Sequence, residues 1–370
     1  MESGCIILFV HPSGSRSASF LPLDKTKEKR SLPSNSSDLV FLPPDAVYMR
    51  DMPVWMAEMV PVPDRSYLLV SPCRDEAQYM RRTLDSIIAQ TVHPARWVIV
   101  DDGSTDDTPA ILAEYAAAHD WITVVQKPDR GARAVGPGVI EAFYFGLAQV
   151  DANAYPYLCK LDLDLDLPPQ YFEILMARME QNSRIGTCSG KPWFRNAAGR
   201  WISEKCGDEM SVGMTKFYRR ECFAQIGGFV REVMWDAIDC HKARQMGWIA
   251  VSWNDEDLRF EHLRPMGSSQ KSVFTGRRRH GFGQYYMGSD PAYFIATGLY
   301  RMAHPPYVLG GLATIQGFLS AWLRGEKQHD DADLRAFVRA YQRRALRVGK
   351  ARAVAEIEAE RSPLWQDPAR

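Results

Sequence analysis

The stretch that decides the fold is CKLDLDLDLPP, residues 159–169, in which leucine alternates with a charged residue. Side chains of a strand point alternately to its two faces, so every leucine falls on one face and every charge on the other. Neighbouring carboxylates on such a face lie ~7 Å apart, and their repulsion costs roughly 2 kcal/mol per pair at a partly screened dielectric. The leucines predict a buried face. The aspartates need a positive partner, just before Pro168 and Pro169 turn the chain.

On both sides of this stretch, short apolar runs alternate with segments of helical periodicity. We expect strands at residues 66–72, 96–100, 121–125 and 157–161, and helices at 77–90, 106–118, 137–149 and 169–180. Strands and helices alternating at this spacing indicate right-handed crossovers within one sheet. The predicted fold class is therefore α/β, with a doubly wound, mainly parallel sheet and flanking helices.

The chain divides into three predicted segments. Residues 1–61 are rich in Ser, Pro and Lys and lack sustained periodicity, so they predict a disordered tail. The alternative is that translation starts at a later methionine and that the start of this segment was wrongly assigned. Residues 62–265 predict the α/β domain. Residues 266–370 have a less regular rhythm and predict a basic, helical appendage.

Two neighbouring features of the appendage suggest contact with a membrane. Residues 306–323 are 18 uncharged residues, ~27 Å long as a helix and short of a ~30 Å hydrocarbon layer. Residues 335–352 carry seven basic residues and no acidic one, which is typical of a helix on an anionic surface. The alternative is a solvated basic helix folded over the α/β domain. We expect peripheral membrane contact through residues 306–352.

Bulk composition excludes several classes of protein. The 45 Lys and Arg residues balance the 45 Asp and Glu residues, so no whole-chain charge favours a nucleic acid partner. The 7 cysteines are scattered and form no C-x-x-C pair, which is typical of reduced thiols in an intracellular protein. The N-terminus has only a short apolar run after an acidic residue and makes a poor signal peptide. We expect a cytoplasmic protein, held at the cytoplasmic face of the membrane.

Polar residues follow each predicted strand, at the edge where open α/β sheets bind their ligands. Asp75 follows the first strand, Asp102 the second and Lys127 the third, and Asp162 and Asp164 follow the fourth. Two carboxylates at positions i and i+2, where a strand ends, can both point into the crevice and share a divalent cation. Mg²⁺ or Mn²⁺ takes such oxygen ligands, keeps several waters and binds substrate phosphates, which a nucleotide diphosphate supplies.

Four motifs in a fixed order resemble family 2 glycosyltransferases of the GT-A fold. They are Pro72-x-x-Asp75-Glu76, VIVDDGSTDDT (98–108), LDLDLDLPP (161–169), and IGGF (226–229) with Asp236 shortly after it. The resemblance implies an enzyme that binds a nucleotide sugar, usually UDP-linked, and transfers the sugar with inversion at the anomeric carbon. The Q-x-x-R-W signature of processive relatives is absent, which favours addition of a single sugar.

The resemblance assigns the donor site to residues of the first three motifs. Asp75 and Asp102 would contact the nucleoside, with Pro72 beside them and Arg133 near the diphosphate. Asp162 would lie against the ribose or the metal.

A divalent cation, Mn²⁺ or Mg²⁺, is implied by the same likeness. Asp164 would be its main ligand, Asp162 a second one, and His262 an additional ligand after the last core strand. A register that uses Asp164 and Asp166 is the alternative.

The resemblance places the general base at Asp236, in a position where the family has a Glu-Asp pair and this chain has Trp235 instead of the Glu. Asp239, one helical turn later, is the rival, and its simpler interpretation is a solvated helix carboxylate. The residues expected to line the acceptor pocket are Glu209, Lys216 and Tyr218. The acceptor itself would be a hydroxyl of a lipid-linked or glycan molecule in polysaccharide or glycolipid synthesis.

Two other interpretations compete with a glycosyltransferase. A nucleotidyltransferase would also use carboxylates and a cation, but it usually shows a Gly-rich phosphate loop after the first strand, which SPCRDE (71–76) lacks. A non-catalytic relative at the membrane would have lost the D-x-D pair or the base, and both are present. A dehydrogenase and a P-loop NTPase are excluded because neither glycine motif occurs.

Overall fold

The computed structural model describes residues 5–10, 16–21, 64–131, 136–264, 273–303 and 307–367. The chain forms two compact units, Met1–Pro61 and Val62–Arg370. In the first unit, strands β1 (Cys5–Val10) and β2 (Arg16–Leu21) pair antiparallel. The division into a tail, an α/β domain and an appendage stays a prediction.

The second unit contains a seven-stranded sheet. Its strands lie in the order β12 (Ile249–Ser252), β8 (Ile185–Ser189), β11 (Thr215–Arg219), β6 (Tyr157–Leu161), β3 (Tyr67–Cys73), β4 (Arg96–Asp101) and β5 (Ile122–Gln126). Strand β3 runs parallel to β4 and β6, β4 to β5, and β8 to β12, whereas β11 is antiparallel to both of its neighbours. The mainly parallel sheet that the sequence predicted is confirmed.

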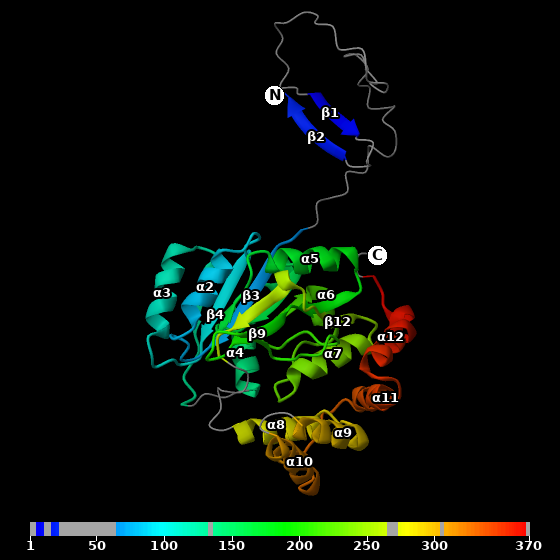
Figure 1. Cartoon of the computed structure of the whole chain (residues 1–370). Helices are drawn as coiled ribbons and strands as arrows, with labels where there is room; N and C mark the ends of the chain where they lie inside the picture. The colour runs from blue at the N-terminus through cyan, green and yellow to red at the C-terminus, as the bar shows by residue number, and fades with distance from the viewer. Residues whose placement is uncertain are drawn as a thin grey trace, which may run out of the picture. The chain divides into compact units, whose positions relative to one another are not determined.

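Helices cover both faces of this sheet (Figure 1). One hydrophobic cluster joins a face of the sheet to α2 (Met80–Ile88), α3 (Thr108–Ala118) and α5 (Tyr171–Gln181). A second cluster joins the other face to α4 (Pro137–Leu147), α6 (Arg220–Gln225) and α7 (Trp235–Gln245). Leu69 belongs to the first cluster and Leu68 to the second, as the alternation of side chains along β3 requires.

The leucine–aspartate stretch leaves the large sheet and enters a smaller one. Strand β6 ends at Leu161, and the next strand is β7 (Leu165–Asp166), which pairs antiparallel with β13 (Arg259–His262). Strand β13 in turn pairs with β9 (Lys191–Arg195), and β9 pairs with β10 (Trp201–Ser203). Residues 162–164, where the predicted carboxylate pair lies, therefore form the junction between the two sheets.

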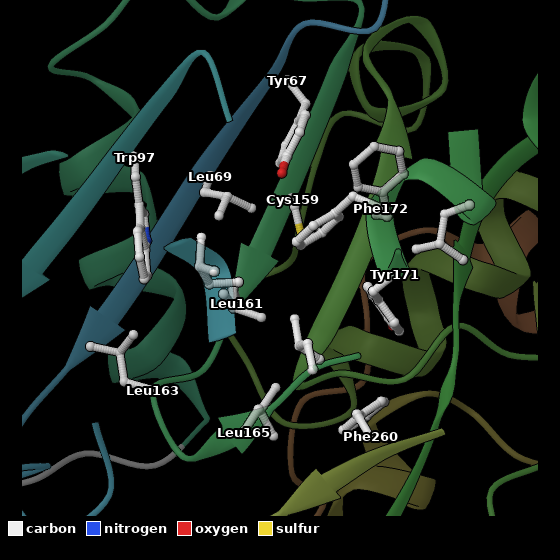
Figure 2. Packing of buried hydrophobic residues seen from close by; sticks show 14 of the residues in the cluster. Tyr67, Leu69, Trp97, Cys159, Leu161, Leu163, Leu165, Tyr171, Phe172 and Phe260 are labelled. Atoms are coloured by element: carbon white, nitrogen blue, oxygen red, sulfur yellow. The ribbon is translucent and has the colours of Figure 1, made fainter. Parts of the chain in front are cut away.

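All four leucines of the stretch are buried in one cluster, as their alternation predicted. Leu161, Leu163 and Leu165 lie with Tyr171 and Phe260 in the core that α5 covers (Figure 2). Their burial fixes the direction of the intervening aspartates, because consecutive side chains of an extended chain point to opposite sides. The buried leucines thus hold the aspartates of the stretch at the edge of the sheet.

Five helices follow the two sheets. They are α8 (Val273–Tyr286), α9 (Pro291–Met302), α10 (Val308–Leu323), α11 (Ala332–Val348) and α12 (Lys350–Arg361), and three short 3₁₀ turns lie at Ala152–Ala154, Glu256–Leu258 and Ser362–Leu364. None of the helices among the described residues is both long enough and apolar enough to cross a membrane.

Helix α11 differs from the expectation that it lies on a membrane surface. Its apolar residues Leu334, Phe337, Val338 and Tyr341 are buried in a cluster with Ile238 of α7. A helix whose apolar face is already covered by protein has none left for a lipid interface. The alternative, a basic helix folded over the α/β domain, is the one observed.

Candidate donor and catalytic site

The loops after β3 and β4 are joined by hydrogen bonds around Asp75. This residue adopts a left-handed conformation with φ of 53°, which is uncommon outside glycine. Its carboxylate Oδ1 accepts a hydrogen bond from the backbone N–H of Thr105 at 2.8 Å, and its own N–H donates to Ser104 Oγ at 3.0 Å. Pro72 lies one residue before the end of β3. The first two motifs therefore form one rigid corner at the carboxyl end of the sheet.

Asp102 lies next to this corner and is paired with two cations. Lys127 Nζ is 3.1 Å from its Oδ1, and Arg130 Nη2 is 2.8 Å from its Oδ2. A cavity of about 420 Å³ opens beside it, lined by Gly103, Ser104 and Lys127 among others. Its volume falls within the range of small-ligand sites. Arg133, predicted near the diphosphate, lies outside the described residues.

Asp162 is held at the end of β6 by Lys160, which stands two residues before it in the sequence. Lys160 is buried, forms an ion pair with Asp162, and donates to the carbonyl oxygen of Gly213 at 3.0 Å. The backbone N–H of Asp162 donates to Met214 O at 2.8 Å. The side chain of Asp162 keeps 33% of its surface exposed, so it can meet a ligand. Lys160 thus supplies a positive partner for the first aspartate of the run.

Asp164 is the most strongly constrained carboxylate of the site. Its Oδ2 accepts hydrogen bonds from Arg264 Nε at 3.0 Å and Nη2 at 2.8 Å, and Arg264 also binds Glu76 Oε1 at 2.7 Å. Burial acts to raise the pKa of Asp164, but hydrogen bonds and charge from His262 and Arg264 outweigh it and lower this pKa to about 2. Its Oδ1 is buried, and no group among the described residues bonds to it.

His262 lies between two carboxylates. Its Nδ1 is 2.7 Å from Glu204 Oε2, and its Nε2 is 3.7 Å from Asp164 Oδ2. Burial acts to lower the pKa of His262, but hydrogen bonds and charge from Asp164 and Glu204 outweigh it and raise the pKa to about 9. The structure therefore brings together the two residues, Asp164 and His262, that were predicted as metal ligands.

Whether these residues fit a divalent cation depends on their free donor atoms. Within the described part of the chain, no group of three or more His, Cys, Asp or Glu side chains is arranged to enclose a metal. Mg²⁺ and Mn²⁺ commonly take only one or two protein carboxylates and complete their shell with water and phosphate oxygens. The unbonded Oδ1 of Asp164 and the partly exposed Asp162 offer such a donor set. The residues therefore fit the cation.

Asp166, the partner in the alternative register, lies apart from this cluster. It belongs to β7, opposite Glu261 of β13, and its carboxylate pairs with Arg82 Nη2 at 2.5 Å. Arg82 also pairs with Glu261 at 2.8 Å. Asp162 and Asp164 flank the junction, whereas Asp166 belongs to the small sheet.

Asp236 lies in the first turn of α7, close to the donor carboxylates. A Cβ atom added to Gly213 would be 2.7 Å from Asp236 Oδ2, so the carboxylate packs directly on this glycine. Gly213 is also the residue whose carbonyl binds Lys160, the partner of Asp162. Burial raises the pKa of Asp236, and the charge of Lys216 acts in the opposite direction. The predicted base and the predicted donor site therefore meet at Gly213.

We expect the substitution Gly213→Ala to lower kcat by about 10- to 100-fold, because a base displaced by about 1 Å loses that much rate. The new methyl group would be 2.7 Å from Oδ2 and 3.1 Å from Cβ of Asp236, so this side chain would have to shift. Donor KM and the thermal unfolding midpoint should change little. Steady-state kinetics and a melting curve check this, and an unchanged kcat would show that the carboxylate position does not matter.

Two residues predicted to line the acceptor pocket are core residues instead. Lys216 and Tyr218 are both 0% exposed and both bond to the carboxylate of Asp239. Burial acts to lower the pKa of Lys216, but the charge of Asp239 and neighbouring groups raises it overall. Asp239 is therefore not a solvated helix carboxylate and is not free to act as a base; it is the counter-ion of a buried lysine.

Trp235, which stands where the resemblance expects a glutamate, contacts two lysines. Its ring lies beneath two buried ammonium groups, with Lys160 Nζ at 5.3 Å and Lys216 Nζ at 5.8 Å from the ring centroid. Such cation–π contacts are stronger when the cation is desolvated. Trp235 thus packs between the lysine that holds Asp162 and the lysine that neutralises Asp239.

Glu209, the third predicted acceptor residue, lies at the boundary with the C-terminal helices. Its carboxylate is 3.2 Å from Lys350 Nζ, and its carbonyl accepts a hydrogen bond from Arg244 Nη2 at 2.6 Å. Glu209 retains some solvent access. The structure does not bring it together with Lys216 and Tyr218 in one pocket.

Comparison with known proteins matches the segment that carries Asp75, Asp102, Asp162 and Asp164. Residues 69–232 match the family model described as glycosyl transferase family 2. The poly-beta-1,6-N-acetyl-D-glucosamine synthase of Staphylococcus epidermidis is 27% identical over 132 residues, which are 35% of this chain and 29% of the relative. The synthase of Staphylococcus aureus strain COL is 26% identical over 125 residues, 34% of this chain and 28% of the relative. The match thus spans less than a third of the length of these relatives.

Solved structures with a related arrangement are more distant in sequence. The mannosyltransferase PcManGT from Pyrobaculum calidifontis, in complex with GDP-Man and Mn²⁺, is 17% identical, with coverage of 82% of this chain and 89% of that chain and a TM-score of 0.44. A TarS structure from S. aureus in complex with UDP is 14% identical, with coverage of 80% and 90% and a TM-score of 0.46. These values are too low to carry an argument about substrate or cofactor.

The family match and the sheet lead to the same conclusion. The matched residues contain the strands and loops that bear Asp75, Asp102, Asp162 and Asp164. Residues 69–232 are therefore similar to the family 2 glycosyltransferases, and the second unit has the mainly parallel sheet with flanking helices that the GT-A fold requires.

Proposed function

We propose that the chain transfers a sugar from a nucleotide diphosphate sugar, of the UDP class, to a hydroxyl group of a glycan or lipid-linked acceptor, with inversion at the anomeric carbon. The curated relatives are named as synthases of a polysaccharide. The family model covers residues 69–232, which bear the donor motifs, and this supports a nucleotide sugar as donor. It says less about the acceptor.

In this proposal the nucleoside lies at the rigid corner formed by the loops after β3 and β4. Asp75 and Asp102 contact it, and the neighbouring cavity gives room for the base. Lys127 and Arg130, which pair with Asp102, place positive charge at the same edge, where the diphosphate carries negative charge. Pro72 lies beside them at the end of β3, and Arg133 is assigned to the diphosphate from the sequence alone.

Asp162 and Asp164 would hold the divalent cation, and His262, which has to lose its proton to bind a metal, would be the third ligand. When bound, the cation would neutralise charge on the departing diphosphate. The role of Asp164 is supported by its unbonded buried oxygen and by a low pKa, which keeps the carboxylate ionised. Arg264, which bridges Asp164 and Glu76, adds positive charge on the other side of the same carboxylate.

The chemical step uses Asp236 as general base. Its carboxylate accepts the proton of the acceptor hydroxyl while the acceptor oxygen forms a bond to the anomeric carbon. The bond from that carbon to the diphosphate oxygen breaks, its electron pair leaves with the diphosphate, and attack from the opposite face inverts the configuration. The observation that carries the proposal is that Asp236 packs on Gly213, which is bound to the Lys160–Asp162 ion pair.

The acceptor side of the site is less defined. Of the three residues predicted for it, only Glu209 has solvent access, so it alone remains in the proposal. A glycan or a lipid-linked saccharide would bring its hydroxyl to Asp236 at the start of α7.

The test is a donor panel of UDP-, GDP- and dTDP-sugars with Mn²⁺ or Mg²⁺, with oligosaccharides and a bacterial lipid extract as acceptors. Release of nucleoside diphosphate together with a product heavier by one sugar residue is the expected result. Release of pyrophosphate would instead indicate a nucleotidyltransferase. Absence of turnover and of donor binding across the panel would indicate a non-catalytic relative.

A further inference from the structure

Helices α9 and α10 expose an unusual amount of apolar surface. Leu323 is 77% exposed, Trp322 62% and Leu309 61%, and the other large apolar side chains exposed on or next to these helices are Ile295, Leu299, Tyr300, Tyr307, Val308, Leu312 and Leu319. Figure 1 shows α8, α9 and α10 as a separate layer below the sheet. So many exposed apolar side chains on two neighbouring helices of a folded chain indicate a partner.

The exposed leucines of α10 form a stripe, and the packing on the opposite side of the helix fixes the direction in which this stripe points. Leu309, Leu312, Leu319 and Leu323 recur at helical spacing, with Gln316 among them. The opposite side of α10 packs on α8 so closely that a Cβ added to Gly281 would be 1.9 Å from Thr314 O. Because this close packing cannot accommodate the leucines, α10 cannot rotate to bury them.

The charged residues within helices α8 to α10 are mostly basic. Residues 273–324 contain five arginines and a single acidic residue, Asp290. Asp290 is buried, accepts hydrogen bonds at the start of α9 and pairs with Arg343 Nε at 2.6 Å, so its charge is neutralised. Arg278 and Arg324 are exposed beside the apolar stripe. The combination of an apolar face with a basic margin is typical of a surface that meets anionic lipid.

We propose that the exposed face of α9 and α10 docks on an anionic lipid bilayer, with its leucines and Trp322 at the boundary of the acyl chains and its arginines among the phosphate headgroups. Helix α10 has 16 residues and is thus ~24 Å long, short of a ~30 Å hydrocarbon layer, so it lies in the interface and does not span it. A second copy of the chain fits this surface less well, because it would bring two sets of arginines together without an opposing acid.

The experiment is flotation of the full chain with vesicles of phosphatidylcholine, with and without phosphatidylglycerol. We expect binding to the vesicles that contain phosphatidylglycerol, weaker binding to phosphatidylcholine alone, and loss of binding as salt is raised. The double variant Leu309→Asp/Leu323→Asp should bind at least about tenfold less, since it places two charges in the interface.

The matched control is Leu346→Asp/Leu364→Asp, which makes the same change at two exposed leucines, one in α11 and one in the 3₁₀ turn after α12. It should bind like the unsubstituted chain. Equal loss in both double variants, or no vesicle binding by the intact chain, overturns the proposal. So does a dimer in light scattering that Leu309→Asp/Leu323→Asp converts to a monomer, because the surface would then serve a second copy. Vesicle binding needs no sugar transfer, so the result is independent of the proposed reaction.

Discussion

Replacing Asp236 by asparagine is expected to lower the rate of sugar transfer by about 10²- to 10⁴-fold, the usual contribution of a positioned general base. Asparagine keeps the size of the side chain and its contact with Gly213, but it cannot accept the proton. Donor affinity should stay within about twofold, since the residue acts in the chemical step and not in donor binding. Single-turnover rates and equilibrium binding of the donor measure the two quantities separately.

The pH dependence gives a second readout of the same residue. Burial raises the pKa of Asp236. A base works only in its ionised form, so the transfer rate should fall as pH drops through this raised value, which lies above that of an ordinary aspartate. The rate of the asparagine variant should not show this fall at low pH. A variant that retained the full rate and the same pH profile would show that Asp236 is not the base.

Replacing Lys216 by methionine is expected to destabilise the protein by about 3–5 kcal/mol, because it leaves the carboxylate of Asp239 buried without a counter-ion. Lys216 is fully buried and contacts Asp239, Tyr218 and the ring of Trp235. Methionine has a similar length and fills the same space, so the loss of stability reflects the removal of the charge. Urea denaturation followed by fluorescence measures the change in the free energy of unfolding.

Two further variants make this prediction specific. The double variant Lys216→Met/Asp239→Leu removes both charges and should recover much of the lost stability. Lys327→Met makes the same substitution in the exposed pair with Asp330 and should leave the urea midpoint unchanged. If Lys216→Met also left the midpoint unchanged, the buried ion pair would not contribute to stability as the structure implies.

Much of the fold could be predicted from the sequence because local patterns and tertiary packing agree. The expected strand at residues 157–161 is β6 without change, and the helix expected at 169–180 is α5, Tyr171–Gln181. The alternation of leucine and aspartate was enough to predict one buried face. It was not enough to show that the chain changes sheets at residues 162–164, because a strand and a sharply bent extended segment have the same two-residue period.

The candidate site could be predicted only where strand ends determine position. Asp75, Asp102, Asp162 and Asp164 follow strands of a parallel sheet, and the sheet brings them to one edge. Lys216 and Tyr218 were misplaced because both belong to β11, whose two faces are buried, and a lysine in a strand is usually exposed. Its buried partner Asp239 lies on α7, far away in the sequence, and no local signal connects the two.

The proposed donor site depends most directly on a divalent cation held by Asp164. Calorimetric titration of UDP, GDP and dTDP tests whether this cation is present in nucleotide binding. We predict that at least one of these nucleotides binds the intact chain at least about tenfold more tightly with Mn²⁺ than with EDTA. Asp164→Ala should abolish this gain, and Asp166→Ala, a change at the neighbouring aspartate that pairs with Arg82, should retain it. Nucleotide affinity that is the same with and without Mn²⁺ in all three proteins would contradict the account.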